Sequence, residues 1–136
     1  MAVGTWLRPV SGFLLGVIVA FSAVALVQRL GHLVFPPPAG LDTSDARAVA
    51  AALEQLPVGA LLFLVAGWAL GSYAGAAVAT WIARAPSPLP GLAVGAVVLG
   101  ATLLTLFNLP HPTWMMMAGA LVPLPAAWLG ARSIAR

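Results

Sequence analysis

Two histidines, His32 and His111, are the residues whose type and spacing come closest to a cofactor site. They occupy equivalent positions in an internal repeat described below, near the ends of two apolar stretches. Two imidazoles on facing helices are the ligand set of a bis-histidine haem. Two histidines alone are too few for a structural zinc site, so no metal is expected. The other interpretation is a pair of interfacial histidines in turns, one of them within Leu109-Pro110-His111-Pro112.

A second candidate site surrounds Pro123 and Pro125 in the last apolar stretch. Each proline removes a backbone N–H, so the carbonyls of Gly119 and Leu121 lose their helical partners. In hydrocarbon those carbonyls need a neighbour, a water or a ligand, and broken helices form binding sites in many transporters. Proline kinks are also ordinary structural features of membrane helices. Both interpretations stay open.

Small residues recur at every fourth position of the second apolar stretch, a spacing that gives a helix a flat groove for a neighbouring backbone. This stripe consists of Gly67, Gly71, Gly75, Ala79 and Ala83. A shorter stripe in the first stretch consists of Gly12, Gly16 and Ala20. The stripes predict either helix packing within one chain or an oligomer face between chains.

The positions of the charges disfavour catalysis and ion-coupled transport. The carboxylates Asp42, Asp45 and Glu54 fall in one loop, and no serine has a histidine–aspartate arrangement suggested by motif. No apolar stretch has a charged residue near its centre, although ion-coupled transport normally needs one at depth. The absence of cysteine excludes thiolate metal sites and thiol redox chemistry. No catalytic residue is predicted.

The composition predicts a membrane protein. Hydrophobic residues make up 62% of the 136 residues and charged residues only 7%, against about 25% charged in soluble domains. Four stretches are long enough to cross about 30 Å of hydrocarbon as helices. They run over residues 9–30, 58–83, 89–109 and 113–131 of a single integral membrane domain, 1–136. The expected fold class is an all-α membrane bundle of four transmembrane helices.

The segment 32–56 is the sizeable piece outside the predicted spans. Its Pro36-Pro37-Pro38 run cannot continue a helix. Farther along, Asp42 and Asp45 resemble a capping box with two acidic partners, and apolar residues then recur at helical spacing. These features predict a short amphipathic helix over Thr43–Leu56, lying on the outer face of the bilayer or covering the bundle.

The arginines predict the orientation of the chain. One side of the predicted spans carries Arg8, Arg84, Arg132 and Arg136, and the other carries Arg29, Arg47 and every acidic residue. The arginine-rich side is expected to be cytoplasmic, which puts both termini in the cytoplasm of a cell whose inner (plasma) membrane holds the protein. Six arginines spread over the chain form no phosphate-tracking patch, so nucleic-acid binding is not expected.

An internal repeat relates the first stretch to the third. At an offset of 79 residues, Pro9, Gly12, Gly16, Val19, Leu30 and His32 align with Pro88, Gly91, Gly95, Val98, Leu109 and His111. The second and fourth stretches align through Ala66-Gly67 with Ala118-Gly119 and through Ile82-Ala83-Arg84 with Ile134-Ala135-Arg136. Both halves begin on the same side, so the repeat predicts two parallel-related helical hairpins. Chance coincidence of glycines and apolar residues is the alternative explanation.

The segment Leu109-Pro110-His111-Pro112-Thr113-Trp114, followed by Leu124-Pro125-Ala126-Ala127-Trp128-Leu129-Gly130, resembles small uncharacterised four-helix inner-membrane proteins of high-GC bacteria. The resemblance covers mostly the C-terminal half and implies no activity. Small multidrug exporters differ because they use a buried glutamate in the first helix, whereas the first acidic residue here is Asp42, outside the predicted spans.

These patterns favour a non-enzymatic inner-membrane protein that acts through lateral contacts with lipid, with a second copy of itself or with a partner membrane protein. The stripe of residues 67–83 would be the contact face, with the helix Thr43–Leu56 as a lid or docking element. The alternative is a small channel or carrier for a neutral or lipid-like solute, using the Pro123/Pro125 break. A bis-histidine haem or quinone redox protein is the third hypothesis, and no other cofactor is expected.

Overall fold

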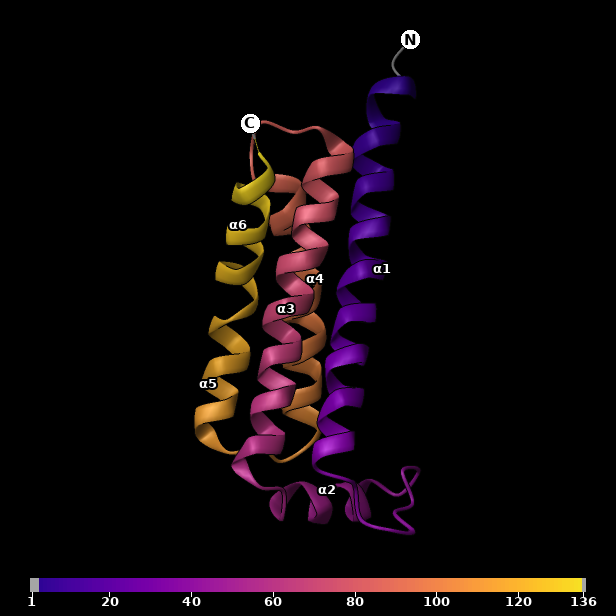
Figure 1. Cartoon of the computed structure of the whole chain (residues 1–136), viewed down its shortest axis with the longest axis vertical. Helices are drawn as coiled ribbons and strands as arrows, with labels where there is room; N and C mark the ends of the chain where they lie inside the picture. The colour runs from indigo at the N-terminus through magenta and orange to yellow at the C-terminus, as the bar shows by residue number, and fades with distance from the viewer. Residues whose placement is uncertain (1–2, 136) are drawn as a thin grey trace.

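The computed structural model describes residues 3–135, and all regular structure in that range is helical (Figure 1). Three candidate membrane spans are single helices: α1 (Val3–Val34), α3 (Val58–Ala83) and α4 (Leu89–Asn108). The fourth span is divided into α5 (Thr113–Leu121) and α6 (Pro123–Ile134). The short helix α2 (Ala46–Glu54) lies between α1 and α3 in the chain. The predicted all-helical bundle with four candidate transmembrane helices is confirmed.

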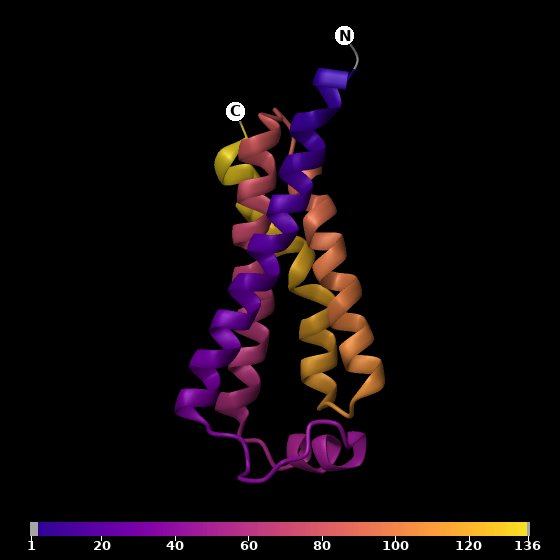
Figure 2. The ribbon, with the colours of Figure 1, turned by 90° about the vertical axis from the view of Figure 1, so that its right-hand side faces the viewer.

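The helix α3 is central to the bundle. It packs against α1, α4, α5 and α6, whereas α1 packs against α3 and α4 and, within residues 3–135, does not reach α5 or α6. We call the end where α1 begins and α6 ends the termini end, and the opposite end the α2 end (Figure 1). Figure 2 shows the α1/α3 pair and the α4/α5 pair diverging toward the α2 end, where α2 lies across the bundle.

The helix α1 extends beyond the predicted span 9–30 at both of its ends. It has 32 residues and is therefore about 48 Å long at 1.5 Å per residue, more than the roughly 30 Å of bilayer hydrocarbon. Pro9 is accommodated near its N-terminal end. The helix ends at Val34 because Pro36 disfavours the helical conformation for Phe35, the residue before it.

The helix α2 is shorter than the predicted Thr43–Leu56 because its N-terminus is capped one turn later. Asp45 is the N-cap residue, and its carboxylate accepts a hydrogen bond of 2.9 Å from the N–H of Arg47. The prediction of a capping box that begins at Asp42 is wrong. The Asp42 carboxylate instead accepts bonds of 2.9 Å from the Ser44 N–H and 2.6 Å from the Ser44 hydroxyl, which forms an Asx turn before the helix.

Small residues bring the backbones of α1 and α3 together. A Cβ on Gly12 would lie 2.7 Å from the carbonyl oxygen of Ala79, and a Cβ on Gly71 would lie 2.6 Å from that of Ala20. Real Cβ atoms essentially never approach a heavy atom closer than 3.0 Å. The stripes of the first and second spans therefore pack against each other, and glycine is required where they meet.

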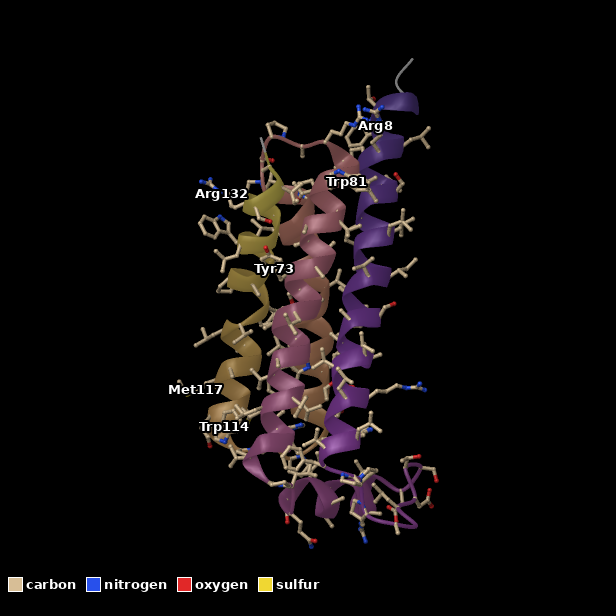
Figure 3. All side chains as sticks on the ribbon, in the orientation of Figure 1. Arg8, Tyr73, Trp81, Trp114, Met117 and Arg132 are labelled. Atoms are coloured by element: carbon tan, nitrogen blue, oxygen red, sulfur yellow. The ribbon has the colours of Figure 1, made fainter. Side chains whose placement is uncertain are left out.

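Aromatic and basic side chains mark the two ends of the bundle (Figure 3). Arg8, Trp81 and Arg132 lie at the termini end, and Trp114 lies toward the α2 end. The Arg132 guanidinium carbon lies 5.3 Å from the centroid of the Trp128 ring, within cation–π range. Tryptophans near both ends are typical of helices that cross a bilayer, where indole rings lie at the headgroup level.

Candidate functional site

An apolar cavity of about 160 Å³ lies between α2 and the adjoining ends of α1 and α3. We call it the α2 cavity. Val49 and Leu53 of α2 and Phe63 of α3 are among the side chains that line it. Gln28 and His32, both on α1, are the only polar residues in its lining. The amphipathic character of α2 is thus explained by a face that covers the end of the bundle.

Phe35 holds the proline-rich loop against α3 and so positions α2. Its ring packs edge-to-face on Phe63, with centroids 6.2 Å apart and an interplanar angle of 67°. The ring occupies the space beside Gly59, where a Cβ would lie 2.5 Å from the Phe35 Cζ. Gly31 in turn makes room for Phe63, whose Cβ lies 2.8 Å from where a Gly31 Cβ would stand. Two glycines therefore allow the aromatic pair that closes one side of the α2 cavity.

A second cavity, of about 130 Å³, lies among α1, α3 and α4, and we call it the interhelix cavity. Trp68 and Thr102 are among its lining residues, and it shares Gln28 and Leu64 with the α2 cavity. No described residue makes a hydrogen bond with the Gln28 side chain. The junction of the two cavities therefore presents a primary amide, with a carbonyl acceptor and an NH₂ donor, in otherwise apolar surroundings.

The two histidines do not line a common cavity. His32 lines the α2 cavity, and His111 lines the interhelix cavity and a separate gap between Leu53 and the α4–α5 turn. The His111 Nδ1 lies 2.8 Å from the Leu109 carbonyl oxygen, which that nitrogen satisfies by donating its proton. Figure 2 shows the end of α1 and the α4–α5 turn on opposite sides of the bundle. This arrangement does not form the facing imidazole pair that the haem hypothesis requires.

The proline break divides the fourth span where the sequence predicts. Gly119 and Pro123 are buried, and a Cβ on Gly119 would lie 2.5 Å from the Leu106 Cδ1 of α4. Leu121 and Pro125 are exposed. None of the four residues lines any of the four cavities described in this section. The break is packed against neighbouring helices on one side and faces outward on the other, so a ligand site there stays a prediction without a cavity.

The expectation that the stripe of the second span is a contact face for another molecule is corrected by the structure. Gly67, Gly71, Gly75 and Ala79 are buried inside the bundle. The backbone of α1 covers them, with the Gly16 carbonyl oxygen 2.5 Å from where a Gly75 Cβ would stand. A second chain would have to displace α1 to reach the stripe. Any face for a partner must therefore lie elsewhere.

A polar cavity of about 520 Å³ lies at the termini end, and we call it the termini-end cavity. It is lined by the end of α3, the first residues of the α3–α4 turn and the end of α6, through Thr80, Trp81, Arg84, Ala85, Ser133 and Ile134. The Ser133 hydroxyl donates to the Gly130 carbonyl at 2.7 Å and accepts a weak bond of 3.4 Å from the Tyr73 hydroxyl. That pair of bonds links α6 to α3 beside the cavity.

Arg84 ends α3 in the left-handed conformation, with φ 51° and ψ 38°. Its N–H donates to the Trp81 carbonyl at 3.2 Å, and the Ala85 N–H donates to the Thr80 carbonyl at 3.4 Å. These two bonds form a Schellman motif, in which the left-handed position is usually a glycine. Arg84 is the only residue other than glycine with a positive φ in the range 3–135.

Comparison with protein-family models, curated proteins and solved structures gives no match to this chain. The resemblance of residues 109–130 to small inner-membrane proteins therefore stays a prediction. Function has to be inferred from the cavities and their lining residues.

Sequence reasoning missed two of these lining residues. Gln28 has a detectable signal, since it is an amide within the apolar stretch 9–30, less than one turn from its predicted end. Arg84 was interpreted as a determinant of topology. Its left-handed conformation has no sequence signal, because glycine or asparagine is the residue that normally indicates such a position.

Proposed function

We propose that the protein is a non-enzymatic membrane protein that binds the acyl chain of a membrane lipid laterally, in the α2 cavity and the adjoining interhelix cavity. The observation that supports this most directly is the Gln28 amide at the junction of two apolar cavities, without a partner among the described residues. An acyl chain would fill the apolar space, and an ester or hydroxyl group would bond to the amide.

The cavity sizes favour a narrow chain over a bulky solute. A cavity of about 150 Å³ with apolar walls holds a molecule the size of benzene, and the two cavities here measure about 160 and 130 Å³. Because an acyl chain in a bilayer is already surrounded by hydrocarbon, burial alone gives it little reason to enter. Selectivity would therefore depend on Gln28 and His32, the polar groups that line the α2 cavity.

The proposed setting is a bacterial inner membrane with the termini end in the cytoplasm, so that the α2 cavity opens in the outer leaflet. The arginine distribution supports this orientation, because the side chains of Arg8, Arg84 and Arg132 lie at the termini end and every carboxylate side chain lies in the segment 42–54.

We also propose that the bundle arose from two related hairpins, α1 with α3 and α4 with α5–α6. Equivalent glycine contacts support the relationship. Gly12 faces Ala79 in the first pair, and at matched positions Gly91 faces Ala131 in the second. The resulting arrangement is not symmetric, since α4 packs on α3 whereas α1 does not reach α6.

We propose neither a channel nor a haem site. Large side chains without exposed surface, Met115, Val94 and Val98 among them, fill the interior where a conducting path would run. Lipid is accordingly the proposed partner. Self-association through the stripe of the second span is not proposed, because α1 occupies it.

The test is lipid retention by a variant whose α2 cavity is filled. Ala60 lines the cavity, so Ala60→Phe should reduce the lipid that co-purifies in mild detergent, counted by native mass spectrometry. A photoreactive fatty-acyl lipid should label residues near Gln28 in the wild type and less in the variant. Ala96→Phe, the same substitution at an exposed position of α4, is the control. Equal retention and labelling in all three proteins would refute the proposal.

A further inference from the structure

The termini end carries positive charge with no carboxylate side chain to balance it. Arg8, Arg84 and Arg132 lie there, whereas the carboxylates of the chain belong to Asp42, Asp45 and Glu54, in and beside α2 at the opposite end. Arg84 forms no ion pair with any described residue. It is also the only charged residue that lines the termini-end cavity. An anionic group in this cavity would therefore meet one unpaired guanidinium and no competing acid.

The conformation of Arg84 suggests that its side chain has a role at this position. A left-handed conformation costs a residue with a Cβ free energy that glycine does not lose. Such strain is retained where surrounding structure or function requires it. In this turn the strained residue is the one whose guanidinium borders the cavity. Guanidinium is the side-chain group best matched to phosphate oxygens, because its planar N–H fork can donate two parallel hydrogen bonds.

A hydroxyl group supplies a second, independent indication of a ligand. Thr80 lines the cavity, is 1% exposed, and its Oγ1 has no hydrogen-bond partner. A buried hydroxyl without a partner is costly, and a phosphate oxygen in the cavity would relieve that cost. Ser133 differs, because its proton is already donated to the Gly130 carbonyl. The available donors are therefore Arg84 and Thr80.

We propose that the termini-end cavity binds the phosphate group of an anionic phospholipid, with Arg84 as the charged donor and Thr80 as the neutral one. The lipid source follows from the depth of the cavity. Trp81 lines it and is 68% exposed, and Trp128 lies close by under Arg132, so indole rings mark the headgroup level around the cavity mouth. A zwitterionic headgroup lacks a partner for its cation here, since no carboxylate side chain lies at this end. This site is separate from the α2 cavity and does not depend on the function proposed there.

The experiment is a lipid titration of the full chain in detergent micelles, read by native mass spectrometry. Phosphatidylglycerol should bind more tightly than phosphatidylcholine, and Arg84→Gln should weaken phosphatidylglycerol binding roughly fivefold. Arg84→Lys should keep most of the affinity, and Thr80→Val should lose part of it. Arg132→Gln is the matched control, because this arginine is at the same end but packs on Trp128 outside the cavity. It should change the affinity less than twofold.

Further arms separate this site from other sources of the same behaviour. Arg84→Gly relieves the backbone, so loss of phosphatidylglycerol in that variant reports the missing charge and not misfolding. Ala60→Phe should leave phosphatidylglycerol binding unchanged, because it alters only the α2 cavity. Equal losses in Arg84→Gln and Arg132→Gln would overturn the proposal in favour of diffuse surface charge. Binding of inorganic phosphate as tight as that of the lipid would overturn the lipid as the source of the phosphate.

Discussion

Gly16 of α1 and Gly75 of α3 face each other so closely that neither can carry a side chain. A Cβ on Gly16 would lie 2.7 Å from the Gly75 carbonyl oxygen, and a Cβ on Gly75 would lie 2.5 Å from the Gly16 carbonyl oxygen. Each helix therefore sets the permitted residue on the other. The neighbouring contacts, Gly12 with Ala79 and Gly71 with Ala20, extend the same relationship along the helices.

Gly75→Ala should destabilise the monomer by about 1–3 kcal/mol, because the added methyl forces the backbones of α1 and α3 apart. Thermal unfolding in detergent, followed by circular dichroism, measures the effect. The control is Gly100→Ala on α4, where a Cβ meets nothing within 4 Å. That change should stabilise by about 0.5–1 kcal/mol, since alanine is the better helix former. A Gly75→Ala protein with unchanged monomer stability but a lost oligomer would return the stripe to an intermolecular role.

The absence of cysteine allows the proposed orientation to be tested without background labelling. Ser44→Cys, beside the start of α2, should react with a membrane-impermeant maleimide added to intact spheroplasts. Ser87→Cys, in the α3–α4 turn at the termini end, should react only after the membrane is opened. The reverse pattern would place the termini end outside and would contradict the interpretation of the arginines.

Pro125→Ala should stabilise the fold by about 1 kcal/mol, the usual net contribution of one hydrogen bond. The new N–H can donate to the carbonyl of Leu121, which faces the exposed side of the break where lipid offers no donor. Pro123→Ala restores a similar bond but removes a fully buried ring, so it should be the less stable of the two variants. Their melting temperatures in one detergent decide the order. If Pro125→Ala melts at or below the wild type, the Leu121 carbonyl is already satisfied.

Local order before α2 should depend on pH. The hydroxyl and the N–H of Ser44 donate to the Asp42 carboxylate and lower the pKa of Asp42 below its ordinary value of 3.8. A carboxyl whose pKa is lower in the folded state contributes stability above pH 3.8, and this contribution is lost as pH falls through the lower folded pKa. The Ser44 amide resonance, followed by NMR in micelles, should show that step below pH 3.8. Asp42→Asn should abolish it, and a step centred above pH 3.8 in the wild type would contradict the prediction.

Arg84→Gly should leave the stability unchanged or raise it by up to about 1 kcal/mol, because glycine adopts the left-handed conformation without strain. Chemical or thermal unfolding in detergent measures this directly. Arg84→Ala is the comparison, since it removes the charge and keeps the Cβ; it should be no more stable than the wild type. A destabilised Arg84→Gly protein would mean that the arginine side chain contributes packing that outweighs the relieved strain.

The positions of the spans were accessible from sequence because they depend on apolar length and proline punctuation. Both ends of α3 agree with the predicted 58–83, since Pro57 precedes the helix and the α3–α4 turn follows it. The ends of α1 were underestimated, because Arg8 and Pro9 were read as the boundary although a helix continues through them outside the hydrocarbon. The N-cap of α2 was misplaced because Asp42 and Asp45 both have capping chemistry, and only the backbone path distinguishes them.

The candidate sites were much less accessible from sequence. A spacing of four predicts that Gly71 and Gly75 share a face, but it does not specify which backbone that face meets. The histidines were paired through the repeat, yet the two hairpins are not related by a symmetry that would bring His32 to His111. Both proposed binding sites depend on gaps left between elements distant in sequence, and such gaps have no local pattern.

The central position of α3 has a consequence for biogenesis. Chains of this kind are made from the N-terminus, and α1 finds its main partner as soon as α3 has been synthesised, before α4 exists. The spans α4 and α5–α6 then add to the opposite side of a pair that is already joined. Assembly can therefore follow the order of synthesis, with no earlier helix waiting for the last one.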